Sequence, residues 1–69
     1  MIGVYILSGK DEGKRGILFS ADARTVEVVT RFEILRIDRS QIKPLDIVNS
    51  FDEVDKLVEQ IIMSPMTGN

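Results

Sequence analysis

The hydrophobic period of this chain changes once, near residue 50, and that change limits the folds open to it. Before it, short runs of β-branched and aromatic residues alternate with polar segments, which is typical of strands. After it, apolar residues recur three and four positions apart, as they do on a helix with one buried face. The helical stripe consists of Phe51, Val54, Leu57, Val58, Ile61 and Ile62. The sequence therefore predicts a mainly β fold with one C-terminal α-helix.

Five strands are expected before the helix. In the first apolar run, residues 2–7, Val4 and Ile6 share one face while Tyr5 lies on the other. Pro44 cannot donate a hydrogen bond to a neighbouring strand, so the last strand is expected at a sheet edge. Several short strands followed by a helix indicate a small barrel whose core the helix enlarges. The later strands are predicted at 15–20, 25–29, 32–37 and, after a short helical turn, within 40–45.

The helix has a recognisable start and stop. Ser50 and Glu53 have the spacing of a capping box, in which Ser50 caps the Glu53 amide and Glu53 reaches back. Pro65 ends the helical pattern. The chain is therefore expected to form one domain, made of a barrel over 1–48, a helix packed on it over 50–63 and a flexible tail over 64–69.

Composition excludes several kinds of chemistry. The 69 residues include no cysteine and no histidine, so disulfides, thiolate zinc sites, cysteine nucleophiles and the commonest general base are absent. The carboxylates form no catalytic pair in the sequence, and no phosphate-binding loop motif is present. The sequence therefore predicts a protein that is not an enzyme and uses no cofactor and no metal. Because no apolar run approaches the ~20 residues of a membrane span, and no signal peptide is seen, a soluble cytoplasmic protein is expected.

Charge is unevenly distributed along the chain, whose formal net charge is −2. Residues 1–43 hold eight basic and six acidic side chains, whereas residues 44–69 hold one basic and five acidic ones. This pattern indicates a mildly basic body with an acidic appendage. A net negative charge argues against indiscriminate binding of nucleic acid.

A glycine- and lysine-rich loop joins the first two predicted strands. Residues 4–18 show an apolar strand, then Gly9, Lys10, Gly13, Lys14 and Gly16 at fixed spacing, then a second apolar strand. This arrangement resembles a KOW motif. The resemblance implies a five-stranded SH3-like barrel. It also implies an adaptor module like those of ribosomal proteins and transcription elongation factors, which bind RNA, RNA polymerase or ribosomal surfaces.

The same loop has a purely physical interpretation. Gly9 and Gly13 permit positive φ angles in a tight loop, and Gly16 removes a side chain where another backbone comes close. The lysines could contact phosphates together, and the loop amides could add to an anion site. The alternative is that the glycines serve the turn and the lysines serve solubility, since Asp11 and Glu12 partly neutralise the loop. The candidate nucleic-acid-binding residues are Lys10, Lys14, Arg15, Arg36 and Arg39.

The remaining aromatic and basic residues are assigned by their ordinary roles. Phe19, Phe32 and Phe51 are predicted to lie in the core, whereas Tyr5 is left open between core and base stacking. Arg31 is expected to pair across strands with Glu27 and Glu33.

Two functions follow from these observations. The first is a KOW-type module, a small transcription regulator among the possibilities, that docks on RNA, DNA or a nucleoprotein machine such as RNA polymerase or the ribosome. The second is a protein–protein adaptor that never touches nucleic acid, because the helix is acidic and its apolar stripe is wide. The partner face of the helix is predicted at Leu57, Ile61 and Ile62, and a second copy of the chain is one candidate partner for it.

Overall fold

The computed structural model describes residues 1–63 of the 69-residue chain. The flexible tail predicted for 64–69 lies outside the described residues. No helix within 1–63 has the length and apolar character that crossing a membrane requires. The elements are β1 (Ile2–Ile6), β2 (Arg15–Ala21), β3 (Thr25–Val29), β4 (Ile34–Asp38), a single 3₁₀ turn (Arg39–Gln41), β5 (Ile42–Ile47) and α1 (Phe51–Met63).

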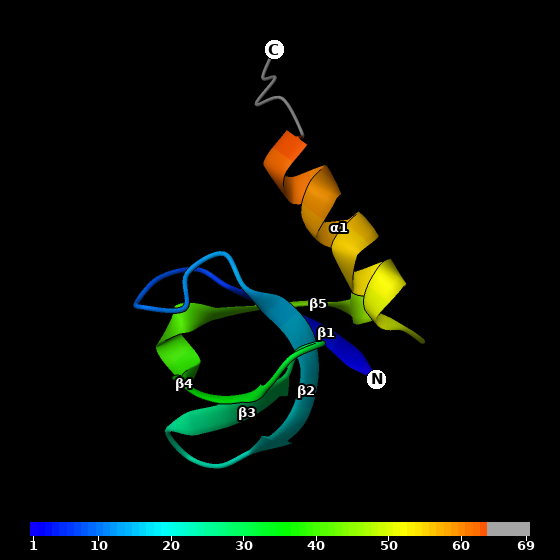
Figure 1. Ribbon diagram of the computed structural model, residues 1–69. Coiled ribbons are helices and arrows are strands. Elements are labelled where there is room, and N and C mark those ends of the chain that lie inside the picture. Colours follow the sequence, from blue (N-terminus) through cyan, green and yellow to red (C-terminus); the bar gives the residue numbers. More distant parts are fainter. Residues whose placement is uncertain (64–69) are drawn as a thin grey trace.

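The five strands form one antiparallel sheet in the order β4-β3-β2-β1-β5 (Figure 1). The mainly β fold with a single C-terminal helix is therefore confirmed. β4 and β5 are the two edges of the sheet, and Pro44 lies in β5 as its missing donor requires. The 3₁₀ turn connects these two edges, and the Leu7 amide donates to the Gln41 carbonyl beside it.

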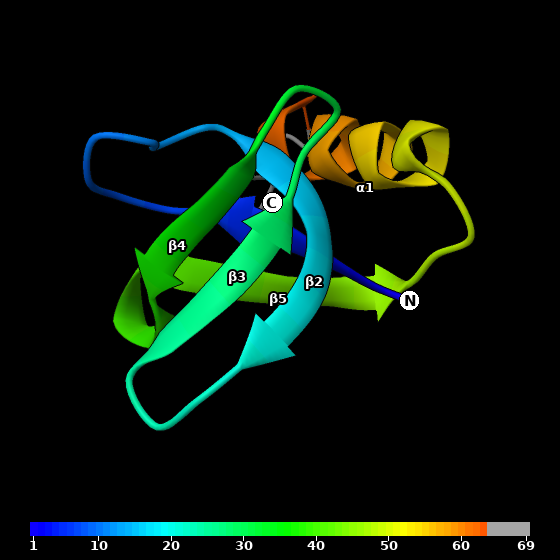
Figure 2. The ribbon, with the colours of Figure 1, turned by 60° about the horizontal axis from the view of Figure 1, so that its bottom comes forward.

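β2 is strongly curved, so that β3 and β4 fold across β1 and β5 (Figure 2). The register of β2 against β3 shifts between Leu18 and Ser20, which leaves Phe19 as the extra residue of a bulge. A bulge bends a strand and increases its twist. The bend brings inward-facing residues of distant strands together in a first core of Val4, Ile6, Val26, Val28 and Ile37.

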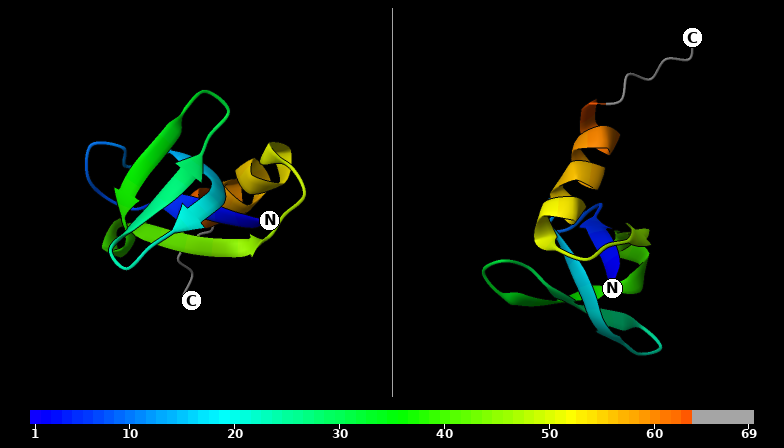
Figure 3. Two further views of the ribbon diagram at one scale, coloured as in Figure 1. Left: turned by 90° about the horizontal axis from the view of Figure 1, so that it is seen from below. Right: turned by 90° about the vertical axis from the view of Figure 1, so that its right-hand side faces the viewer.

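Helix α1 packs on the opposite face of β1 and β2. Figures 1 and 3 show the helix and the β2–β3 turn at opposite ends of the molecule. Alternation along β1 explains the two faces, because Val4 enters the first core while Tyr5 packs against the second. The second core consists of Ile17, Val48, Val54 and Val58.

The predicted helix cap is present, with one difference in its partner. The Glu53 amide donates to the Ser50 hydroxyl over 3.3 Å, as expected. The Glu53 carboxylate reaches back and accepts a hydrogen bond of 3.0 Å from the Asn49 amide, one residue before the cap. Both contacts satisfy amides near the first turn of α1.

Two of the three phenylalanines that the sequence assigned to the core are not there. Phe19 is 66% exposed because it is the extra residue of the β2 bulge. Phe32 is 90% exposed because it lies in the turn before β4, which begins at Ile34 and not at residue 32. Phe51 is half-buried against the second core, and Tyr5 is also packed against that core.

Candidate functional site

The glycine-rich loop is held by its own backbone. Gly9 and Gly13 have φ angles of 91° and 89°, as predicted. The amides of Glu12, Gly13 and Lys14 donate to carbonyl groups within or beside the loop, over 2.9–3.1 Å. These three amides are therefore engaged by backbone carbonyls and are not free to bind a phosphate.

The loop lysine nearest the sheet is engaged by carboxylates. Lys14 Nζ donates to the Asp11 carboxylate over 2.8 Å and to that of Glu33 over 3.1 Å. Asp11 is only 7% exposed and is the one buried charged residue of the described chain. Hydrogen bonds from Lys14 to Asp11 and then Glu33 raise the pKa of Lys14 above its ordinary value.

A second ion-pair network links the sheet to the helix. Arg31 donates to Asp52 over 2.6 Å and to Asp55 over 3.0 Å. These two hydrogen bonds, the first to Asp52, raise the pKa of Arg31. Arg15 approaches Asp55 at 3.6 Å and also donates to the Gly13 carbonyl. The cross-strand pairing of Arg31 with Glu27 and Glu33 is therefore wrong, because the folded chain brings helix carboxylates closer.

The turn between β3 and β4 presents Phe32. The hydroxyl of Thr30 accepts hydrogen bonds from the amides of Phe32 and Glu33 over 3.1 and 3.0 Å. The Thr30 amide donates to the Glu33 carbonyl over 2.8 Å, which closes the turn. A threonine turn of this kind contains neither glycine nor proline, so the commonest turn signals are missing from its sequence. The threonine three residues before Glu33 was the signal that could have placed Phe32 on a turn.

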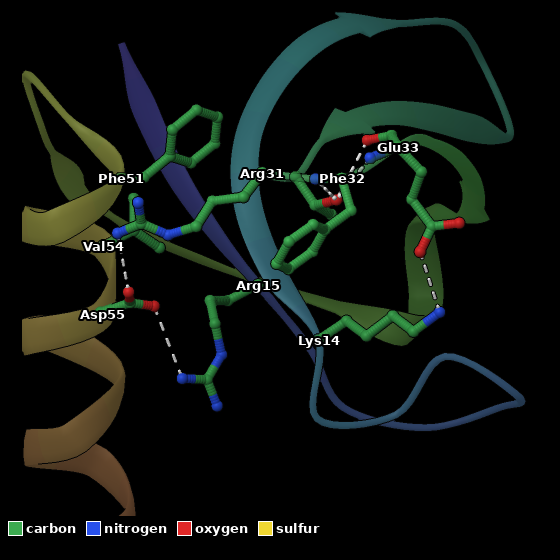
Figure 4. A pocket seen from close by; sticks show the side chains of 9 residues that line it. Lys14, Arg15, Arg31, Phe32, Glu33, Phe51, Val54 and Asp55 are labelled. Atoms are coloured by element: carbon green, nitrogen blue, oxygen red, sulfur yellow. Dashed lines mark hydrogen bonds and ion pairs between the residues drawn. The ribbon is translucent and has the colours of Figure 1, made fainter.

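A hollow of about 400 Å³ lies between this turn, the start of β2 and helix α1 (Figure 4). We call it the aromatic hollow. The Arg31 guanidinium lies over the Phe51 ring at 5.6 Å, which is a cation–π contact. In Figure 4 the Phe32 ring lies above the Arg15 and Lys14 side chains, and Arg31 reaches Asp55 on the helix. The lining of the aromatic hollow combines apolar side chains with charges of both signs: Phe32, Phe51, Val54, Lys14, Arg15, Arg31, Glu33, Asp55 and Thr30.

The five candidate nucleic-acid-binding residues do not gather in one cluster. Lys14 and Arg15 line the aromatic hollow beside the β3–β4 turn. Arg36 lies 3.5 Å from Glu27, and Arg39 donates to the Asp22 carbonyl at the β2–β3 turn. The length of β3 separates the two turns, a span of about 15 Å. Lys10 is an exposed loop residue with no ion pair among residues 1–63.

Only part of the predicted partner face of the helix is exposed. Leu57 packs against the second core, whereas Ile61 and Ile62 are 39% and 59% exposed. They lie on the last turns of α1, which extend beyond the sheet in Figure 1. Within residues 1–63, no group of acidic side chains could hold a metal ion.

Comparisons with family models, with curated proteins and with solved structures find no significant match for this chain. The resemblance to the KOW motif therefore rests on the loop residues Gly9, Lys10, Gly13, Lys14 and Gly16.

Proposed function

We propose that this chain is a non-enzymatic docking module that binds a partner protein through the aromatic hollow. The observation that carries the proposal is Phe32, which a hydrogen-bonded turn holds 90% exposed at the edge of an apolar recess. An exposed aromatic side chain on a firm support is the kind of anchor that dominates binding energy at protein interfaces. The half-buried Phe51 supplies apolar surface beside it, and the buried Val54 lies at the back of the recess.

Electrostatics favour protein over nucleic acid at this surface. Around the hollow, three cations (Lys14, Arg15 and Arg31) are matched by four carboxylates. A phosphate would have to displace those carboxylates and would meet a local net negative charge. Nucleic-acid affinity depends mainly on cations that neutralise phosphates, so this arrangement weakens it.

The resemblance to the KOW motif indicates where a partner protein would be found. Family members act as adaptors on RNA polymerase and ribosomal surfaces, so a protein subunit of such a machine in the cytoplasm is the partner that we propose. The module would then contact a protein subunit of the machine and make no contact with its nucleic acid.

Photo-crosslinking tests the proposal directly. Phe32 is replaced by p-benzoylphenylalanine in the full chain, expressed in cells and irradiated, and the adducts are identified by mass spectrometry. We expect a discrete protein adduct from position 32. The matched control carries the same group at Phe19, an exposed aromatic position outside the hollow. No adduct at position 32, or the same adducts from both positions, would contradict the proposal.

Single-stranded nucleic acid is the second candidate ligand. Its support is the proximity of two phenylalanine rings to Arg15, Arg31 and Lys14, since aromatic rings stack bases and cations meet the backbone. Fluorescence anisotropy with single-stranded RNA and duplex DNA at low and high salt tests it. Salt-sensitive binding that Lys14→Glu and Phe32→Ser both abolish would replace the protein ligand with RNA, whereas binding that neither change alters would exclude this site.

A further inference from the structure

The aromatic hollow and Phe32 lie side by side, so the same surface contains both a projection and a recess. We infer that this surface pairs with a second copy of the chain across a two-fold axis, with Phe32 of each copy seated in the hollow of the other. The inference rests on the proposed docking function and adds self-association to it: when the partner subunit is absent, a second copy covers the same surface.

Two-fold symmetry sets the shape that such a surface must have. In a contact of this type the same patch is used by both subunits, so each projecting group needs a matching recess within that patch. Phe32 is 90% exposed, and the recess beside it is lined by Phe51 and Val54. An aromatic ring placed there would replace its contact with water by contact with the half-buried Phe51 ring.

The charges around the hollow meet the second requirement of self-pairing. A patch of one sign would repel its own copy, whereas a patch whose cations are already paired with carboxylates of the same chain repels it little. The rim carries Lys14, Arg15 and Arg31 together with Glu33 and Asp55. Opposite signs therefore face the same recess, and a second copy would meet little net charge there.

The area required is available on this chain. A standard interface covers about 800 Å² on each partner, which is about a sixth of the 4754 Å² of accessible surface. Ile34, two residues after Phe32, adds a further exposed apolar side chain: it is 61% exposed and pairs with Val29 on the neighbouring strand. A small chain with a thin core also has much to gain from burying apolar surface against a partner.

The helix end is the competing surface for a dimer, and it provides the matched control. Ile62 is 59% exposed on the last turns of α1, away from the lining of the hollow. A dimer through the helix would depend on Ile62, whereas a dimer through the hollow depends on Phe32. Both side chains are exposed, so their replacement by serine leaves both cores intact.

Sedimentation velocity on the full chain tests the inference over protein concentrations from about 10 µM to about 1 mM, a range that brackets weak association constants. We expect a monomer–dimer equilibrium whose Kd rises at least about tenfold in Phe32→Ser. Ile62→Ser is expected to leave the Kd unchanged, and far-UV circular dichroism checks that both variants are folded. A chain that stays monomeric throughout, or a dimer that Ile62→Ser dissociates and Phe32→Ser does not, would overturn the inference.

Cysteine crosslinking gives an independent readout, because the chain has no cysteine of its own. Under mild oxidation Phe32→Cys is expected to form a covalent dimer faster than Ile62→Cys, and equal rates would count against the hollow. The proposed function is separable from this result. If the chain is monomeric but benzophenone at position 32 captures a different protein, only the self-pairing fails. An adduct of twice the 7.8 kDa chain mass identifies self-pairing instead.

Discussion

Gly16 lies on β2, between β1 and β3. It pairs with Val4 on β1, and a Cβ atom at this position would overlap the carbonyl oxygen of Val29 on β3. The overlap is with backbone, which cannot move aside as a flexible side chain would. Gly13 differs, because a Cβ there meets open space and only its φ of 89° opposes a side chain.

Gly16→Ala should therefore cost more stability than Gly13→Ala. Overlap with backbone in a packed sheet predicts a loss of about 3 kcal/mol or more for Gly16→Ala. A left-handed φ predicts about 1–2 kcal/mol for Gly13→Ala. Urea denaturation of both variants measures the two losses, and equal values would contradict the close approach at Gly16.

The carboxylate of Asp22 holds the β2–β3 turn. Its hydrogen bonds from the Thr25 amide, then the Arg24 amide, keep the pKa of Asp22 below its ordinary value. Asp38 acts similarly in the 3₁₀ turn, where the amide and then the hydroxyl of Ser40 lower the pKa of Asp38. Both carboxylates bind protons more weakly in the folded chain than in the unfolded one.

Stability should consequently fall in acid. A lowered folded-state pKa contributes stability that is fully present above the unfolded pKa, about 4 for aspartate, and is lost as pH falls through the folded pKa. The free energy of unfolding should be flat between about pH 5 and 7 and decline below about pH 4. In Asp22→Asn the amide oxygen still accepts the turn hydrogen bonds but no longer titrates, so the decline should be shallower. Urea titrations of the parent chain and of Asp22→Asn across this pH range measure the two declines, and equal slopes would contradict the role of the Asp22 carboxylate.

At the scale of elements, helix α1 depends on its cap and on its buried face. Val54 and Val58 are the helix residues that are fully buried, while Asp52 and Glu53 place acidic groups in the first turn. Carboxylates there favour the positive end of the helix dipole. The Ser50 hydroxyl satisfies the Glu53 amide, which has no partner within the helix.

Ser50→Ala should destabilise the protein by about 1 kcal/mol, the usual cost of losing a serine N-cap. Ser8→Ala is the matched control, because Ser8 is an exposed loop residue whose hydroxyl makes no hydrogen bond among residues 1–63. We expect it to stay within about 0.5 kcal/mol of the parent chain. Thermal and urea unfolding followed at the far-UV helix signal measure both, and a neutral Ser50→Ala would show that the cap is not needed.

At the scale of the whole molecule, two small cores share the same strands. The first core holds Val28 and the second holds Val58, each at 0% exposure. β1 and β2 contribute residues to both cores, because successive side chains point to opposite faces. Unfolding the helix would expose Ile17 on β2. The next residue of that strand, Leu18, packs against the first core, so the two cores are coupled through β2.

The chain should unfold in one cooperative transition. Tyr5 is its single tyrosine, no tryptophan is present, and Tyr5 packs beside the helix core, so its fluorescence reports on that core alone. Far-UV circular dichroism reports on the whole fold, and the two urea curves should coincide. Val28→Ala and Val58→Ala should each remove about 1–3 kcal/mol and shift both curves together. A Tyr5 transition that precedes the circular dichroism transition would show that the helix detaches first.

Much of the fold is readable from local patterns. The strand around Val4, the helix with its cap at Ser50, and the glycine requirement at Gly9 and Gly13 are all predicted correctly, because each depends on neighbours a few residues away. The β3–β4 turn is missed because Thr30 forms it without glycine or proline. The core assignment of Phe19 fails because a bulge depends on the partner strand, which local alternation does not reveal.

By itself, the sequence determined the mainly β fold, the single C-terminal helix and the glycine positions of the loop, since backbone sterics and hydrophobic period act locally. Only the tertiary structure decided what the basic and aromatic residues do. Lys14 meets Glu33 nineteen residues away, and Arg31 meets Asp52 across twenty-one. Such pairs exist only after the bend of β2 and the packing of α1 bring distant segments together. The same packing leaves Phe32 exposed beside a recess, and so it turns a predicted core residue into the centre of the candidate site.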